Sequence, residues 1–222
     1  MIATSIALLL AAFLVYASYN IRSNIYLKVF SKHKTIEKIV AITFDDSPDP
    51  VQTPRVLQVL KQQQVPACFF CIGQKVKGNE QLIRQIIAEG HLIGNHSFTH
   101  ANAFPLYSRS RMEKDLQACQ TVLEEATSQK IDLFRPPFGV TNPTIAQVCK
   151  RLGYTPIGWN IRTLDTQQPS AEKVLRRIKK KLCPGSIILL HDRMPDSDLL
   201  LTAVLNYIKE QGYTVVRLDK MM

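Results

Sequence analysis

Short apolar runs rich in β-branched and aromatic residues alternate along the chain with longer stretches whose apolar positions recur every three or four residues. The short runs are typical of buried strands and cover residues 38–44, 67–73, 91–97, 132–137, 154–160, 186–192 and 213–219. The longer stretches predict helices over residues 53–64, 79–90, 110–126, 142–153, 170–182 and 196–212.

The predicted helices have recognisable ends. Thr53 followed by Pro54, and Asn142 followed by Pro143, are typical of an N-cap and a first helical position. Gly153 is a stop signal for the second of these helices. Long linkers, internal repeats and low-complexity segments do not interrupt the alternation.

Seven strands that alternate with six helices predict parallel strands wound in one direction. The alternatives are an open doubly wound sheet and a closed barrel. The first strand is not followed by a G-x-G-x-x-G loop, which weakens the dinucleotide-binding version. The short, even strands favour an α/β fold of the distorted, TIM-like (β/α) barrel type, with about seven parallel strands.

The N-terminus has a different pattern. Residues 1–21 contain no charged side chain, and about 20 apolar residues can cross a bilayer. A basic start and a clear cleavage site are missing, so a retained anchor is preferred to a cleaved signal peptide. The predicted organisation is a transmembrane or signal-anchor helix over 1–21, a basic juxtamembrane linker over 22–36 and a catalytic domain over 37–222.

Composition and charge narrow the function classes. The 222 residues are 45% hydrophobic and carry a formal net charge of +10, which describes a folded protein with an excess of basic residues. Basic residues are not interleaved with aromatic ones, so no nucleic-acid partner is predicted. Cys68 and Cys71 form a C-x-x-C inside a predicted strand, where they would point to opposite faces as buried residues.

Ionisable and metal-binding residues gather at the ends of the predicted strands, where parallel α/β folds place their ligands. They are Asp45, Asp46, His96, His100, Arg135, Asn160, Arg162, Asp165, His191 and Asp192. His96 and His100 are four residues apart and, with a carboxylate from another strand end, would form an open three-ligand metal site. Zn²⁺ suits this set best, and Co²⁺, Ni²⁺ and Fe²⁺ are also chemically reasonable.

Two further pairs follow from the same placement. His191 emerges from an apolar strand near Asp165, which makes it a candidate general acid. Arg135 precedes two prolines and could pair with Asp45, either as part of the chemistry or as a salt bridge that neutralises the rim.

Five segments in order resemble the motifs of the polysaccharide deacetylase family, carbohydrate esterase family four: TFDDSP, HSFTH, RPPFG, GWNIRTLD and IILLHD. The resemblance extends from about Lys38 to the end of the chain. It implies a distorted (β/α) barrel and the metal-dependent removal of acetyl groups from sugars.

The resemblance also implies a role for each matching residue. Asp45 would be the general base, and Asp46, His96 and His100 would hold one divalent metal ion. His191 would be the general acid tuned by Asp165, and Arg135 would orient Asp45. The substrate-binding residues would be Pro137, Phe138, Trp159 and Leu189, with the Phe138 amide at the oxyanion and Trp159 and Leu189 around the acetyl methyl.

Ser47, Phe138, Arg162 and Thr166 depart from the usual motifs, and the last two affect the shape of the sugar-binding groove. An N-acetylhexosamine polymer such as peptidoglycan or a chitin-type chain is the expected substrate. The alternatives are an O-acetyl xylan esterase, a non-catalytic membrane-tethered glycan-binding protein and a hydrolase of small amides.

The expected partners are an acetylated glycan and, through the N-terminal helix, a membrane; no protein partner is implied. The basic flank after the helix favours a cytoplasmic domain by the positive-inside rule. Acetylated polymers favour a domain facing the cell envelope, and this orientation is preferred because the substrate argument is more direct.

Overall fold

The computed structural model describes residues 2–167 and 170–222, with the backbone alone for residues 2 and 3. Seven of its strands form one path in the order β5-β4-β3-β2-β1-β7-β6, and β8 pairs with the start of β1. The strands are β1 (Ile39–Ser47), β2 (Cys68–Cys71), β3 (Leu92–Asn95), β4 (Leu133–Phe134), β5 (Thr155–Pro156), β6 (Ile161–Arg162), β7 (Ser186–His191) and β8 (Thr214–Val215).

The pairs between these strands are all parallel, which confirms the parallel α/β sheet predicted from the sequence. The sheet is a curled half-barrel rather than a closed barrel, because the path ends at β5 on one side and β6 on the other. The predicted run 154–160 contains only the two-residue β5, and β6 follows as a separate strand.

The segment after the first helix lies along the open part of the sheet. Phe30 forms a parallel bridge with Ile157, and Lys32 forms an antiparallel bridge with Ser186 at the start of β7. The amide of Gly158 donates to the carbonyl of Phe30 at 2.9 Å. Residues 30–32 therefore extend the hydrogen bonding of the sheet beyond its own strands.

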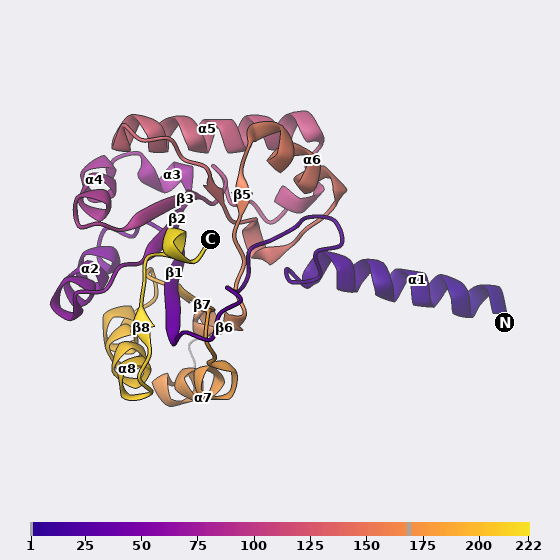
Figure 1. Ribbon diagram of the computed structural model, residues 1–222. Helices are drawn as coiled ribbons and strands as arrows, with labels where there is room; N and C mark the ends of the chain where they lie inside the picture. Colours follow the sequence, from indigo (N-terminus) through magenta and orange to yellow (C-terminus); the bar gives the residue numbers. More distant parts are fainter. Residues whose placement is uncertain (1, 168–169) are drawn as a thin grey trace.

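Helices surround the sheet on the outside of its curve (Figure 1). The longer ones are α2 (Gln52–Gln63), α4 (Glu80–Ala88), α5 (Arg109–Thr127), α6 (Pro143–Leu152), α7 (Ala171–Lys181) and α8 (Ser197–Glu210), and all six fall on predicted helical stretches. The other helical segments are α1 (Ile2–Tyr19), α3 (Gly73–Val76), η1 (Phe104–Leu106), η2 (Pro137–Gly139), η3 (Asp165–Gln167) and η4 (Leu218–Met221).

Strand alternation divides the core into two layers. Val40, Ile42 and Phe44 of β1 pack in the larger apolar cluster under the helices, whereas Ala41 packs in a second cluster inside the curve. Cys68 and Cys71 fall in different layers and are both buried and free, as the strand pattern predicts. Residues of β1 and β7 that face the inside of the curve therefore lead toward one rim.

The two predicted N-caps differ in outcome. The side chain of Asn142 accepts from the amide of Ile145 at 2.8 Å and caps α6, as expected. Helix α2 instead begins at Gln52, whose amide donates to Asp49 Oδ1 at 2.8 Å. Thr53 lies one position inside the helix, where its hydroxyl donates to the buried carboxylate of Asp192.

The prediction of a membrane anchor is wrong. Among the described residues, no helix combines the length and the apolar character that a membrane crossing requires. Helix α1 ends at Tyr19, and Ala17 and Ile21 near its end are buried in the domain rather than available to a span. The carbonyl of Ser18 accepts from the amide of Thr141 at 2.9 Å, which ties this end to the domain.

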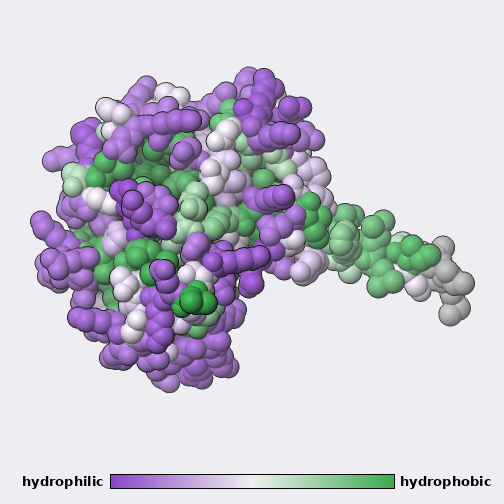
Figure 2. Space-filling view, viewed as in Figure 1, coloured by the Kyte–Doolittle hydropathy of each residue, from purple (hydrophilic) through white to green (hydrophobic). Residues whose placement is uncertain are grey.

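The rest of α1 projects from the body of the molecule with apolar side chains exposed (Figures 1 and 2). Met1, the first residue of the predicted anchor, lies outside the described residues. The predicted localisation, a membrane-anchored domain facing the cell envelope, depended on this anchor and is therefore wrong as well.

Candidate active site

The carboxyl ends of four strands of the parallel sheet, β4, β3, β1 and β7, bring the main candidate residues to one rim. Asp45 and Asp46 lie at the end of β1, and His96 follows β3 directly. Arg135 follows β4, and His191 is the last residue of β7, where it is the register partner of Asp45. The rule that ligands bind at the carboxyl ends of parallel strands therefore places these residues together.

A backbone irregularity turns two successive carboxylates toward the same place. Adjacent residues of a regular strand point to opposite faces. The register of β1 against β2 shifts between Phe44 and Ser47, and Asp46 has a left-handed φ of 68°. Bulges of this kind redirect side chains. As a result, Asp45 and Asp46 both approach Nε2 of His96, at 3.8 Å and 3.6 Å.

Asp46, His96 and His100 form a compact cluster of candidate metal ligands. One ligand atom from each lies within 4.8 Å of the others, and Asp46 Oδ1 is 3.4 Å from His100 Nε2. His96 Nδ1 is engaged by the carbonyl of Arg135 at 2.8 Å, which leaves Nε2 for the cluster. Two imidazoles and a carboxylate fit Zn²⁺, and the other divalent ions predicted from the sequence share this ligand chemistry.

The protonation states of the cluster suit metal binding. Burial by itself would raise the pKa of Asp46, but its interactions with His96, His100 and His191 and the hydrogen bond from Arg193 lower it well below the usual range. Burial, followed by the neighbouring His96, lowers the pKa of His100 to about 4. At neutral pH the cluster therefore offers an ionised carboxylate and a neutral His100 ring, the forms that bind metals.

Arg135 is fully buried and holds Asp45. Its Nη1 donates to Asp45 Oδ1 at 2.7 Å and to the hydroxyl of Thr43 at 2.8 Å. Nη2 donates to the carbonyl of Gly158 at 2.8 Å, and Nε donates to the carbonyl of Ile157 at 3.2 Å. This network fixes one oxygen of Asp45, while Oδ2 is the oxygen that approaches His96.

His191 and Asp165 form the second predicted pair. Asp165 Oδ1 lies 2.8 Å from Nδ1 of His191, and Oδ2 accepts from the backbone amide of His191 at 2.7 Å. Burial alone would lower the pKa of His191, but the hydrogen bond and charge of Asp165 outweigh burial and raise it. This hydrogen bond engages Nδ1 and not the second ring nitrogen, Nε2.

Of the residues expected to bind substrate, Phe138 lies beside the cluster and the others are buried nearby in the fold. Phe138 has a left-handed φ of 61°, and its ring packs against that of His100 in a tilted arrangement, with the ring centres 4.7 Å apart. Trp159 and Leu189 are buried in the inner apolar cluster, and Pro137 is buried in η2. A cavity of about 470 Å³ opens above Asp46, with His100 and Phe138 in its lining.

Sequence reasoning missed two basic residues in this cavity. Arg193 Nε donates to Asp46 Oδ2 at 2.8 Å, and Lys75 Nζ donates to the backbone carbonyl of Asp46 at 2.7 Å. Arg193 follows His191 and Asp192 at the same strand end, so the placement rule could have found it. Lys75 lies in the short helix α3, which has no comparable signal.

Asn160 is a strand-end residue that the sequence made a candidate for the site, but its side chain is hydrogen-bonded away from the rim. Its side-chain carbonyl accepts from the amide of Ile187 at 2.7 Å, and its Nδ2 donates to the hydroxyl of Ser186 at 3.0 Å. These partners lie at the start of β7. Asn160 therefore supports the sheet rather than the rim.

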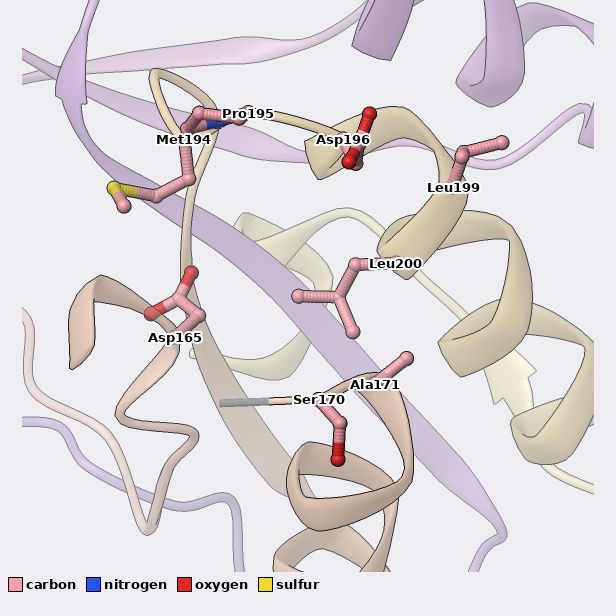
Figure 3. Close-up of a pocket in the computed structure, with 8 residues that line it drawn as sticks. All are labelled: Asp165, Ser170, Ala171, Met194, Pro195, Asp196, Leu199 and Leu200. Atoms are coloured by element: carbon pink, nitrogen blue, oxygen red, sulfur yellow. The ribbon is translucent and has the colours of Figure 1, made fainter. Parts of the chain in front are cut away.

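A second cavity of about 440 Å³ has Asp165 in its lining (Figure 3). Met194, Leu199 and Leu200 line it, with Leu199 and Leu200 on the first turn of α8 (Figure 3). This cavity adjoins the carboxylate that holds His191, whereas the cavity above Asp46 adjoins the candidate metal ligands. The latter brings Asp46 and His100 together with Phe138 in one lining.

The half-barrel and its rim define a class of protein, a distorted (β/α) barrel with a His-His-Asp cluster beside a buried Asp–Arg pair. Residues 32–157, more than half of the chain, match the polysaccharide deacetylase family. The chain therefore belongs to that family, as its five motifs predict, and its enzyme class is polysaccharide deacetylase.

Several known proteins are similar over most of the chain. A peptidoglycan-N-acetylglucosamine deacetylase of Bacillus cereus is 36% identical, with 84% of this chain and 89% of the relative covered. A peptidoglycan-N-acetylmuramic acid deacetylase of Bacillus subtilis is 33% identical over 85% of this chain and 73% of the relative.

A solved structure adds a qualification. A pseudoenzyme of carbohydrate esterase family four from Bacillus anthracis superposes with a TM-score of 0.81 at 29% identity, over 87% of this chain and 68% of the other. Because the family fold also occurs in a pseudoenzyme, the roles of individual residues here have to be argued from this chain's own site.

Proposed function

We propose that the protein hydrolyses N-acetyl groups of an N-acetylhexosamine glycan, of the peptidoglycan or chitin type, and releases acetate. The observation that carries the proposal is the convergence of Asp45, Asp46, His96 and His100 at one rim beside the His191–Asp165 pair. The peptidoglycan deacetylases among the relatives support this substrate class.

Asp46, His96 and His100 would hold the divalent ion, for which Zn²⁺ is the first choice. When bound, such an ion polarises the acetyl carbonyl and lowers the pKa of a coordinated water. The protein's own contribution starts from Asp45, because Arg135 restrains Oδ1 and leaves Oδ2 facing the cluster. Asp45 Oδ2 would take the proton of the attacking water.

His191 would act at the opposite end of the reaction. Asp165 holds Nδ1, so that Nε2 of the protonated ring can donate to the departing amine nitrogen. An amide needs such a proton more than an ester does, because an amine anion is a poor leaving group. The backbone amide of Phe138 would donate to the oxyanion, and Pro137, Trp159 and Leu189 would surround the acetyl methyl.

The test is acetate release from peptidoglycan strands, chitin oligomers and acetylated xylan, with Asp45→Asn and His191→Ala beside the unchanged protein. We expect release from the first two substrates, and a loss of about 100-fold or more in each variant with the metal content unchanged. Full activity of Asp45→Asn would remove the base assignment. Release from xylan alone would favour the esterase alternative, and binding without release would indicate a glycan-binding protein.

A further inference from the structure

The cavity above Asp46 contains an excess of positive charge. Two basic side chains, Lys75 and Arg193, line it. Among the described residues of the lining, Asp46 is the acidic one. Both basic groups contact this one residue, Lys75 at the backbone carbonyl and Arg193 at carboxylate Oδ2. Because one carboxylate balances one cation, the lining keeps a positive charge, which a bound divalent ion would increase.

Both basic groups retain hydrogen-bonding capacity for a ligand. Lys75 donates to the backbone carbonyl of Asp46, which is neutral, so this hydrogen bond does not pair the ammonium with a negative charge. Arg193 has five N–H donors. In the described part of the chain its recorded partners are Asp46 Oδ2 and the thioether sulfur of Met194, a weak acceptor 3.6 Å from Nη1. Its side chain is 38% exposed.

The position of this charge restricts what could neutralise it. Lys75 and Arg193 contact the same aspartate that lies 3.4 Å from His100 in the candidate metal cluster. An acetyl group under attack at that cluster would therefore lie next to both cations. An anion carried on the same sugar, close to the acetamido group on the ring, would lie beside both cations.

We propose that Lys75 and Arg193 bind a carboxylate on the reacting sugar, so that the preferred substrate is an acidic N-acetylhexosamine with an ether-linked carboxylate beside the acetamido group. N-acetylmuramic acid has this chemistry, whereas N-acetylglucosamine is neutral. Charged hydrogen bonds of this kind are stronger than neutral ones, and they give specificity between similar substrates. The inference rests on the proposed deacetylation at the same site.

The sharpest test changes the substrate rather than the protein. Acetate release is measured on a glycan strand with free lactyl carboxylates and on the same strand after conversion of those carboxylates to methylamides. We expect kcat/KM for the muramic acid residues to fall about tenfold on amidation, the size of one lost charged contact. A chitin oligomer serves as the neutral reference.

Variants connect the effect to the two residues. Lys75→Gln and Arg193→Gln should each bring the ratio of kcat/KM for the free carboxylate to kcat/KM for the methylamide toward one, whatever their effect on the absolute rate. Lys209→Gln, the same change at the exposed end of α8, should leave the ratio unchanged. Titration of metal-free protein with N-acetylmuramic acid and its methylamide provides a binding readout that is independent of turnover.

The outcomes separate the two proposals. Equal acetate release from the acid and the methylamide, or faster release from the methylamide, would overturn the inference while leaving the proposed deacetylation intact. An undiminished ratio in both variants would also overturn the assignment to Lys75 and Arg193. Absence of acetate from every glycan would instead contradict the proposed function itself.

Discussion

At the scale of single residues, the site depends on polar groups that are held by several partners at once. Arg135 is fully buried and donates to Asp45, Thr43 and two backbone carbonyls. Its guanidinium also lies 4.1 Å from the centre of the Phe70 ring. A residue enclosed in this way contributes to folding as well as to the orientation of Asp45.

Removal of that guanidinium should therefore be costly. Arg135→Met leaves a buried carboxylate without its partner, and we expect a loss of about 3–5 kcal/mol in the free energy of unfolding. Urea denaturation measures this change in the free energy of unfolding. The control is Arg151→Met, which breaks the ion pair of a 58% exposed arginine with Glu113 and should cost at most about 1 kcal/mol. Equal losses in the two variants would contradict the prediction.

The His191–Asp165 pair gives a prediction about pH. Asp165 raises the pKa of His191, so the ring stays protonated to higher pH than an isolated histidine would. An enzyme that needs protonated His191 loses activity as the pH rises through this pKa. Asp165→Asn removes the charge, and the alkaline loss of activity should move to lower pH.

NMR titration of the His191 ring protons measures the same shift directly. Asp196→Asn is a suitable control, because Asp196 lines the same cavity beside Asp165 and has an exposed side chain. An unchanged His191 pKa in Asp165→Asn would show that the hydrogen bond does not set its protonation.

At the scale of elements, short irregular segments position the site. The turn η2 places Phe138 against His100, and Gly139 in the same turn has a left-handed φ of 70°. A Cβ atom at Gly139 would approach Cη2 of Trp159 to 2.5 Å. The turn is therefore packed directly on the buried indole.

Gly139→Ala should destabilise the protein through both backbone strain and this overlap, by about 2–4 kcal/mol. Gly153→Ala is the matched control, since its φ is 71° and a Cβ there would meet nothing within 4 Å. Gly153→Ala should lose only the free energy of backbone strain at this positive φ, about 1–2 kcal/mol. Thermal unfolding of the two variants measures the difference, and equal midpoints would exclude the contact with Trp159 as its cause.

At the scale of the whole molecule, the cluster joins segments that are far apart in the chain. Asp46 comes from the end of β1, and His96 and His100 come from the segment after β3. A ligand that binds the folded arrangement and not the unfolded chain stabilises the whole fold. Metal binding should therefore be visible in global stability.

Zinc at 100 times its dissociation constant should raise the free energy of unfolding by about 2.7 kcal/mol, and a chelator should reverse the increase. His100→Ala should abolish this gain, whereas His33→Ala, outside the cluster, should keep it. Calorimetry with and without zinc provides the measurement. A zinc-dependent gain that survives in His100→Ala would place the metal elsewhere.

Much of the fold and of the site was open to prediction from local patterns. The six long outer helices lie where 3.6-residue periodicity placed them, because each buries one apolar face on the sheet. Asp45, His96, Arg135 and His191 meet because parallel strands end at a common rim. The roles of these residues remain predictions, but their proximity followed from strand direction and residue type.

Other features depended on contacts between distant segments. Ala17 and Ile21 are buried in the domain, so only the last part of the uncharged stretch that resembled an anchor became part of a core. Asn160 has the polarity of a site residue, but its side chain accepts a hydrogen bond from Ile187 at the start of β7. Lys75 reaches Asp46 from a helix that has no motif of its own.

The amino-acid sequence by itself determined that two carboxylates end the first strand, since residue order and strand pattern are local properties. Only the tertiary structure decided that both approach His96, because alternation along a regular strand would have separated them. The left-handed Asp46 and the shifted register of β1 against β2 bring them together. Such a bulge is stabilised by neighbouring strands and by Lys75 and Arg193, which lie far away in the chain.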